Sequence, residues 1–443
     1  MSSAAEIVQQ NKEHTLVSWN AQGTWNPIPV ERAEGVYVYD ANGKRYLDWS
    51  SQLVNMNLGH SHPHVVKAIQ EQAAKLCYVD PGWATEPRGR LGTMLAEVSG
   101  LQKALFTNGG TDAVENAMKI ARMYTGKQKV FTRYKSYHGA TFAAMSAGGD
   151  PRRIGNEPGV PWIVRMPDPY AYRNPIYRGI SQEEGDAIIA DLVEDMVLME
   201  GPDTVAAIMV EGYSGSSGVL QPTAVYFNRL REICDKYNLL LIVDEVMSGF
   251  GRTGEWFGIQ HYPNAKPDIM ALAKGITSGY VPLGATLISE KVASYFDDHV
   301  LQTGLTYSAH ALATAAGVAA MEVYHQENLI VRSREMGKVL RRGLMDLAEK
   351  HPVIGDVRGA GLHTVIELVK SRETREPMSP FNKPFSDPMK KAAGALKANG
   401  LTTLVRWNLI MNCPPLIITE AQIQEGLDIL DTVLTDLDQA YEG

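Results

Sequence analysis

The stretch LLLIVDEVMSGFGRTG, residues 239–254, combines an apolar run, an acidic pair and three glycines. The apolar run is typical of a buried β-strand, and it ends in Asp244 and Glu245. Gly249, Gly251 and Gly254 spell G-x-G-x-x-G, a pattern found in dinucleotide-binding loops. Two hypotheses follow: a nucleotide site, or an acidic group held at a sheet edge for a different cofactor.

The order of these features argues against a nucleotide site. A dinucleotide fingerprint places its glycines between a strand and a helix, with an acid about 20 residues further on. Here the acids precede the glycines, and the following EWFGIQHYP does not resemble the start of a helix. A nicotinamide-dependent dehydrogenase is therefore the weaker alternative. A phosphate-loop ATPase is disfavoured as well, because the Gly-Lys pairs at residues 43, 126 and 337 are not followed by Ser or Thr.

Composition narrows the class of protein. The 443 residues are 44% hydrophobic and 21% charged, as in an ordinary globular chain. The net charge is −8 and no Lys/Arg cluster occurs, so we expect no nucleic-acid partner. Cys77, Cys234 and Cys413 are too far apart to suggest a disulfide framework. The sequence shows no secretory-signal pattern and no membrane-spanning apolar run, which predicts a cytoplasmic protein without membrane contact.

Apolar runs alternate with amphipathic segments through the middle of the chain. Strands are predicted at 103–107, 129–133, 205–212, 239–245 and 284–289, and helices at 112–126 and 225–238. This alternation predicts an α/β fold with a mainly parallel sheet.

The two ends of the chain differ from the middle. The segment 35–51 predicts a hairpin that turns at Asn42-Gly43, and the last third predicts a helix, a strand, a Pro- and charge-rich stretch at 370–388 and two closing helices. We assign 1–70 to an N-terminal segment and part of a small domain, 71–323 to a large domain, and 324–443 to the C-terminal small domain.

Three histidines, His60, His62 and His64, alternate in GHSHPH. On a strand they would share one face and could bind a metal ion. Because Gly59, Ser61 and Pro63 indicate a turn instead, we expect no metal site.

Lys274 lies in PDIMALAKGITSGYVPLGA, a segment of small and apolar residues. A desolvated lysine has a lowered pKa, which suits it to Schiff-base chemistry. Upstream, a Gly109-Gly110 loop precedes Thr111, which we expect to be the N-cap of a helix whose free N–H groups bind a phosphate. Taken singly, Lys274 is more simply a solvated surface lysine, and a routine strand-to-helix turn explains the Gly109-Gly110 loop equally well.

Together the motifs NLGHSHP, TNGGTDAVENAMKIAR, YHGAT, DEVMSGFGRTG, PDIMALAKG, PLGA, TYSAH and CPPLIIT resemble those of the class III aminotransferases. These are fold type I pyridoxal-phosphate enzymes that include ω-amino acid and amine transaminases. The resemblance implies a large domain with a mainly parallel seven-stranded sheet, and a smaller α+β domain formed by both chain ends.

The resemblance also implies roles for the residues above. Lys274 would hold the cofactor aldehyde as an internal aldimine, and Asp244 would pair with the pyridine nitrogen. Gly110 and Thr111 would bind the phosphate. Thr306 in TYSAH would reach a phosphate across a dimer interface.

Further positions match residues that surround the cofactor ring. Tyr137 and Val246 would lie on opposite ring faces, and Glu211 would lie near the ring. Without the resemblance, a core tyrosine, a core valine and a strand-end glutamate would be the simpler interpretations.

The substrate pocket is less well marked. In EGYSGSSG, Ser216 stands where many relatives have a glutamate that holds a carboxylate-binding arginine, so that partner is expected to be absent. Arg406 resembles the mobile arginine that binds a keto-acid carboxylate. Val54 in place of an aromatic residue suggests a wider pocket, and Trp19 is a candidate for lining its entrance.

These residues predict a ping-pong transaminase that moves an amino group from an ω-amino acid or primary amine to pyruvate or a similar keto acid. We expect a homodimer, or a dimer of dimers, with shared active sites. A mutase, racemase, decarboxylase or lyase of the same class is the nearest alternative, because the same carbanion can be quenched in several ways.

Overall fold

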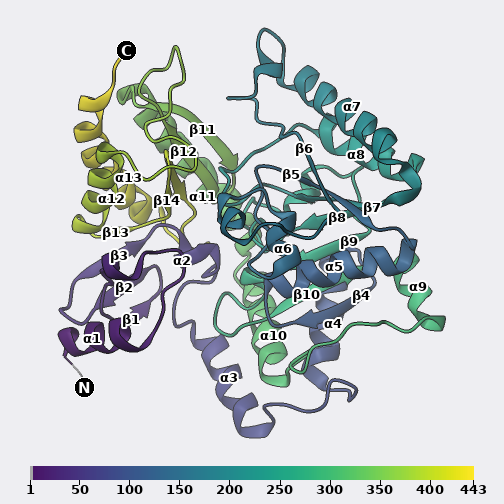
Figure 1. Ribbon diagram of the computed structural model, residues 1–443. Helices are drawn as coiled ribbons and strands as arrows, with labels where there is room; N and C mark the ends of the chain where they lie inside the picture. The colour runs from purple at the N-terminus through teal and green to yellow at the C-terminus, as the bar shows by residue number, and fades with distance from the viewer. Residues whose placement is uncertain (1–2) are drawn as a thin grey trace.

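A computed structural model describes residues 3–443 and contains a central seven-stranded sheet (Figure 1). The strand order is β4-β10-β9-β8-β7-β5-β6. Only β10 runs antiparallel to its neighbours, which confirms the predicted mainly parallel sheet. The strands are β4 (Lys103–Thr107), β5 (Lys129–Arg133), β6 (Ile163–Met166), β7 (Val205–Glu211), β8 (Leu240–Asp244), β9 (Ile269–Leu272) and β10 (Gly284–Ile288).

Helices cover both faces of this sheet. Every residue of β7 and β8 is buried, which explains their continuous apolar sequences. Alternate side chains enter different cores: Ala207 and Met209 pack with α5 (Gly110–Thr125), whereas Ile208 and Val210 pack in the core that includes α8 (Ala224–Lys236). The predicted strand-helix alternation is therefore confirmed.

The two chain ends together form the smaller domain. One sheet has the order β1-β2-β3-β13, and in it β13 pairs in parallel with β3. Its hairpin turns where predicted, with Gly43 at φ +81°. The other sheet has the order β11-β12-β15-β14. The strands are β1 (Val30–Glu34), β2 (Tyr37–Asp40), β3 (Arg45–Asp48), β11 (Ile354–Ala360), β12 (His363–Leu368), β13 (Leu401–Thr402), β14 (Val405–Arg406) and β15 (Leu409–Asn412).

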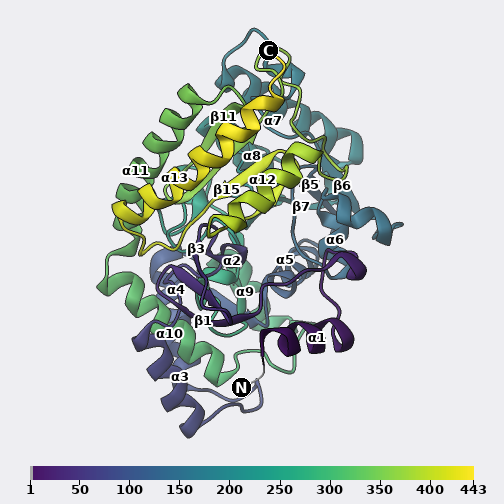
Figure 2. The same cartoon turned by 90° about the vertical axis from the view of Figure 1, so that its left-hand side faces the viewer.

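Helices α11, α12 and α13 form the outer layer of this smaller domain, and α1 lies near the N-terminus below it (Figure 2). The predicted domain boundaries after residues 70 and 323 fall inside α3 and α10, and they stay predictions. Within residues 3–443, no helix has the length and apolar character needed to cross a membrane. The remaining helices are α1 (Ala4–His14), α2 (Ser51–Val54), α3 (Pro63–Lys75), α4 (Glu86–Ser99), α6 (Phe142–Ala147), α7 (Gln182–Glu200), α9 (Glu290–Asp298), α10 (Ala311–Gln326), α11 (Leu329–Lys350), α12 (Asp387–Ala398) and α13 (Glu420–Leu437).

The glycine loop after β8 packs against α11. Gly251 and Gly254 have φ angles of +87° and +89°, which side chains of L-residues rarely adopt. A Cβ on Gly251 would lie 2.8 Å from Ile330 Cδ1, and one on Gly254 would lie 3.2 Å from Arg334 Cβ. The G-x-G-x-x-G pattern therefore serves a tight turn against a helix, which explains it without a nucleotide.

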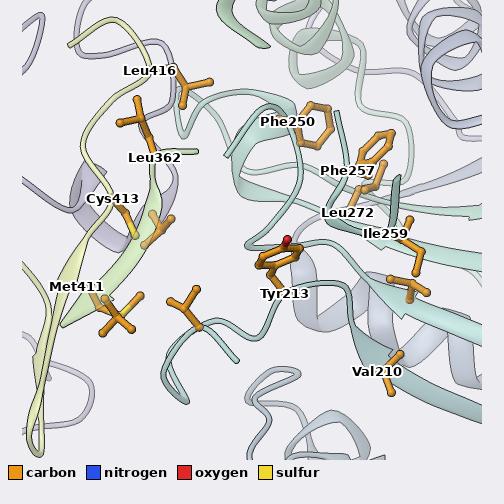
Figure 3. Close-up of a cluster of buried hydrophobic side chains, with 14 of the residues drawn as sticks. Val210, Tyr213, Phe250, Phe257, Ile259, Leu272, Leu362, Met411, Cys413 and Leu416 are labelled. Atoms are coloured by element: carbon orange, nitrogen blue, oxygen red, sulfur yellow. The ribbon is translucent and has the colours of Figure 1, made fainter. Parts of the chain in front are cut away.

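Arg252 in this loop joins the two domains. Its fully buried guanidinium donates hydrogen bonds to Asn57 Oδ1 at 2.8 and 2.9 Å and to the carbonyl oxygens of Cys413 and Pro414 at 3.0 and 2.6 Å. Apolar contacts extend the same junction, where Phe250 and Phe257 lie in one buried cluster with Leu362, Cys413 and Leu416 (Figure 3).

Replacing Arg252 with methionine should strongly destabilise the protein. Each buried acceptor left without a donor costs about 1–3 kcal/mol, so we expect a loss of more than 3 kcal/mol in the free energy of unfolding. Urea unfolding of Arg252→Met would test this, with Arg342→Met on the exposed side of α11 as a control that changes by about 0.5 kcal/mol or less. Equal unfolding midpoints for the two variants would contradict this role.

Candidate active site

Two acidic residues end neighbouring parallel strands. Glu211 closes β7 and Asp244 closes β8, and the strand register places them directly side by side. Their exposed fractions are only 5% and 4%. Lys274 follows the end of β9, the next strand in the sheet. Because the carboxyl ends of parallel strands meet at one edge, the fold brings these three predicted residues together.

His138 holds the carboxylate of Asp244. Its Nδ1 lies 2.8 Å from Asp244 Oδ2, and the Val246 N–H donates to Asp244 Oδ1 at 2.9 Å. The ring is buried, and its Nε2 has no hydrogen-bond partner among residues 3–443. No sequence pattern singled out His138, although it lies next to Tyr137 in the YHGAT motif. Its contact with Asp244 spans 106 positions, and only the fold reveals it.

Glu211 positions the segment that carries Tyr137. Its Oε1 accepts the Tyr137 N–H at 3.2 Å, and its Oε2 accepts the Gly215 N–H. Burial raises the pKa of Glu211, while His138 and Arg133 lower it. Glu211 therefore supports both the loop before Gly215 and the backbone beneath the Tyr137 ring.

Lys274 is the unpaired cation of this group. Its side chain makes no ion pair or hydrogen bond with any residue from 3 to 443, and it is partly accessible. Burial lowers the pKa of Lys274, against the opposing effect of Asp244 and Glu211. A lowered pKa increases the fraction of neutral amine, which is the nucleophilic form.

The N-terminus of α5 offers free N–H groups. The helix begins at Gly110, and its N-cap is Gly109 without a side-chain cap. Thr111 therefore lies inside the first turn, and our prediction that it caps the helix is wrong. Glycine replaces a capping side chain here, so the first N–H groups stay available to an anion.

The surroundings of Gly110 and Thr111 fit a phosphate cradle. A Cβ on Gly110 would lie 2.8 Å from Val246 Cγ1, so only glycine fits there without displacing that side chain. The Thr111 and Thr141 hydroxyl oxygens lie 2.7 Å apart, and Thr141 donates to Glu115 at 2.7 Å. The Thr111 hydroxyl is thereby held in place while its residue stays partly accessible.

A shared carboxylate holds two arginines beside Tyr137. Asp150 is buried and forms ion pairs with both Arg152 and Arg406. The Arg152 guanidinium lies 4.0 Å from the Tyr137 ring centroid and 5.0 Å from that of Trp19. Burial lowers the pKa of Arg406, and Asp150 opposes this effect. Arg406 thus has an acidic partner that no sequence motif indicated.

Neither Val54 nor Thr306 forms a side-chain hydrogen bond or ion pair with this group within the described residues. Val54 is only 1% exposed and belongs to the main hydrophobic core. Thr306 is exposed, and its carbonyl oxygen accepts a hydrogen bond from Tyr78 at 2.7 Å. Its side chain has no hydrogen bond with the start of α5 within the described chain. The roles assigned to Val54 and Thr306 stay predictions.

The three alternating histidines bind separate carboxylates. His60 contacts Asp48 at 2.9 Å, and His62 contacts Glu327 at the same distance, while His64 contacts Glu322. Among residues 3–443, no group of three or more His, Cys, Asp or Glu side chains has the arrangement of a metal site.

Sequence comparison finds aminotransferases over nearly the whole chain. The family model described as "Aminotransferase class-III" matches residues 19–434. The taurine–pyruvate aminotransferase of Bilophila wadsworthia is 35% identical, covering 99% of this chain and 98% of the relative. The putrescine–pyruvate aminotransferase of Pseudomonas aeruginosa is 33% identical, with 89% and 88% coverage.

Solved structures of similar proteins agree with this fold. A taurine:2-oxoglutarate aminotransferase from Bifidobacterium kashiwanohense, solved with pyridoxal phosphate and glutamate, superposes with a TM-score of 0.97 at 42% identity and 100% coverage of both chains. A thermostable (S)-enantioselective ω-transaminase from Thermomicrobium roseum gives a TM-score of 0.92 at 34% identity, with 99% coverage of both chains.

The arrangement predicts where pyridoxal phosphate attaches. After incubation with the cofactor and reduction with borohydride, peptide mass spectrometry should find the pyridoxyl group on Lys274, because its amine is unpaired and its pKa is lowered. Lys274→Ala should abolish this adduct, and Lys119→Ala on the exposed side of α5 should retain it. An adduct on another lysine of the unaltered protein would refute the assignment.

Proposed function

The chain belongs to the class III aminotransferases, and we propose that it transfers the amino group of an acid-ended ω-amino compound to a keto acid. It is a pyridoxal-phosphate-dependent transaminase. Bound pyridoxal phosphate supplies an aldehyde that takes up the amino group and a ring that withdraws electrons from the adjacent carbon.

The chain's own residues prepare this chemistry. Lys274 would hold the aldehyde carbon, and its Nζ would then carry a proton to and from the reacting carbon. Asp244 would face the ring nitrogen as a carboxylate, held in place by His138 and the Val246 N–H. A negative charge in a buried setting favours the protonated ring nitrogen, which strengthens electron withdrawal.

The phosphate and the ring faces have matching groups. Gly110 and Thr111 would bind the phosphate through the start of α5. Tyr137 and Val246 would lie against the two ring faces, and Glu211 would keep Tyr137 in place through its backbone. The free N–H groups at the start of α5 fit the anionic phosphate, and the buried Asp244 carboxylate fits a protonated ring nitrogen.

The proposed substrate class rests mainly on the carboxylate of Asp150, which two arginines share. Two guanidinium groups and one carboxylate leave one positive charge unbalanced beside Tyr137. Either arginine can bind an acid group with paired N–H donors. We assign the keto-acid carboxylate to Arg406, and the acid end of the donor to Arg152 with Trp19 beside it.

The relatives suggest what that acid end is. Two of them act on taurine, whose acid group is a sulfonate, and their acceptors are pyruvate and 2-oxoglutarate. A sulfonate has three oxygens that guanidinium donors can bind. Taurine and the corresponding β-amino acid are therefore the first donors to test.

We also propose that the protein forms a homodimer. A homodimer would place Thr306 of one subunit near the phosphate of the other. The exposed side chains of Val300 and Tyr307 in the same loop, and of Trp83, support a surface covered by a second subunit. A cytoplasmic location stays a prediction, supported by three cysteines that form no disulfide.

Amino transfer itself tests the proposal. Purified holoenzyme with taurine and pyruvate should form alanine, and with 2-oxoglutarate it should form glutamate. Chromatography of the amino acid products measures both reactions. The rates with taurine are compared with those of a panel of neutral amines, which lack the acid group. Carbon dioxide release, racemisation or amino-group migration without a keto-acid acceptor would instead indicate the decarboxylase, racemase or mutase alternatives.

Variants of the two arginines should separate the two half-reactions. Loss of a charge-assisted pair costs about 1.5–3 kcal/mol, so Arg152→Met should raise KM for taurine about tenfold or more while changing KM for benzylamine little. Arg406→Ala should raise KM for pyruvate about tenfold or more while changing KM for benzylamine little. Steady-state kinetics measures both, with Arg342→Met as the control. Equal effects on charged and neutral substrates would show that neither arginine binds the acid group.

A further inference from the structure

A cationic cavity adjoins the segment that holds Asp150 and Arg152. It has a volume of about 70 Å³ and lies between α6, the short helical turn Pro151–Asn156, and β6. A single water needs about 10–15 Å³ by the same measure, so the cavity has room for a group with several oxygens.

The charges lining this cavity do not balance. Arg153 and Arg165 both line it, and Glu157 is the single acidic residue among its lining residues. Glu157 pairs with Arg153, whereas Arg165 has no carboxylate partner within residues 3–443. Two arginines facing one space with one carboxylate leave a net positive charge.

The hydrogen-bonding groups are also incompletely used. The Nε atoms of Arg153 and Arg165 are both buried without a partner among the described residues. Arg165 donates through Nη2 to the Ser146 carbonyl oxygen at 2.7 Å, which fixes its position. Burial, and next the charge of Arg153, lower the pKa of Arg165, as expected for a guanidinium without a neutralising neighbour.

We propose that this cavity is a binding site for one small tetrahedral oxyanion, such as inorganic phosphate or sulfate, held between Arg153 and Arg165. An oxyanion accepts hydrogen bonds from both guanidinium groups and offsets their repulsion. Arg152 and Arg153 are consecutive residues. The proposed anion site and Arg152, the proposed substrate-binding arginine, therefore share one short helical turn.

Isothermal titration calorimetry of the holoenzyme with sodium phosphate, at constant ionic strength in sodium chloride, tests the site. Using the holoenzyme keeps the cofactor's own phosphate position filled. We expect saturable binding of one phosphate per chain, with sulfate competing. Arg165→Met and Arg153→Met should each raise the Kd at least tenfold, and Arg342→Met should leave it unchanged.

Two further variants separate this site from the substrate arginines and from misfolding. Glu157→Gln should lower the Kd severalfold, because it removes the carboxylate that competes for Arg153, and a misfolded protein would not bind more tightly. Arg152→Met should leave phosphate binding intact. Absence of saturable binding, or binding lost in Arg152→Met but kept in Arg165→Met, would overturn the proposal.

Discussion

The adjacent ends of β7 and β8 are the constraint on which the active site depends. Parallel register places Glu211 beside Asp244, and burial makes each charge costly unless it is bound. The segment after β5 supplies a contact to each acid: His138 contacts Asp244, and the backbone N–H of Tyr137 contacts Glu211. The backbone N–H groups of Val246 and Gly215 complete the set. The segment after β5 is therefore fixed by the two acids, and the aromatic ring it carries is fixed with it.

A single carboxylate also organises the proposed substrate side. Asp150 holds Arg152 and Arg406, which come from segments more than 250 positions apart in the chain. Because the carboxylate is shared, movement of one arginine would change the pairing of the other. This coupling offers a physical route for one pocket to receive a keto acid in one half-reaction and a different acid in the other, with no glutamate at position 216.

The sequence predicted the elements whose signals are local. The wholly buried strands β7, β8 and β10 and the hairpin at Asn42-Gly43 follow from apolar runs and turn chemistry, and the resemblance placed Lys274 and Asp244. Strands β6 and β9 were not predicted, because each has only four residues and β6 is a partly exposed edge strand. Partners of the site residues, such as His138 for Asp244 and Asp150 for Arg406, lie over 100 positions away, and no periodicity reports such contacts.

The pairing of β13 with β3 bears on how the chain folds during synthesis. Leu401 and Thr402 close a sheet whose other three strands end by Asp48. A ribosome must therefore release about nine-tenths of the polypeptide before β13 covers the edge of β3. Until then the N-terminal hairpin has an unpaired edge strand with which other chains could pair. Chaperone capture of the nascent N-terminal segment would protect this edge until residues 401–402 emerge.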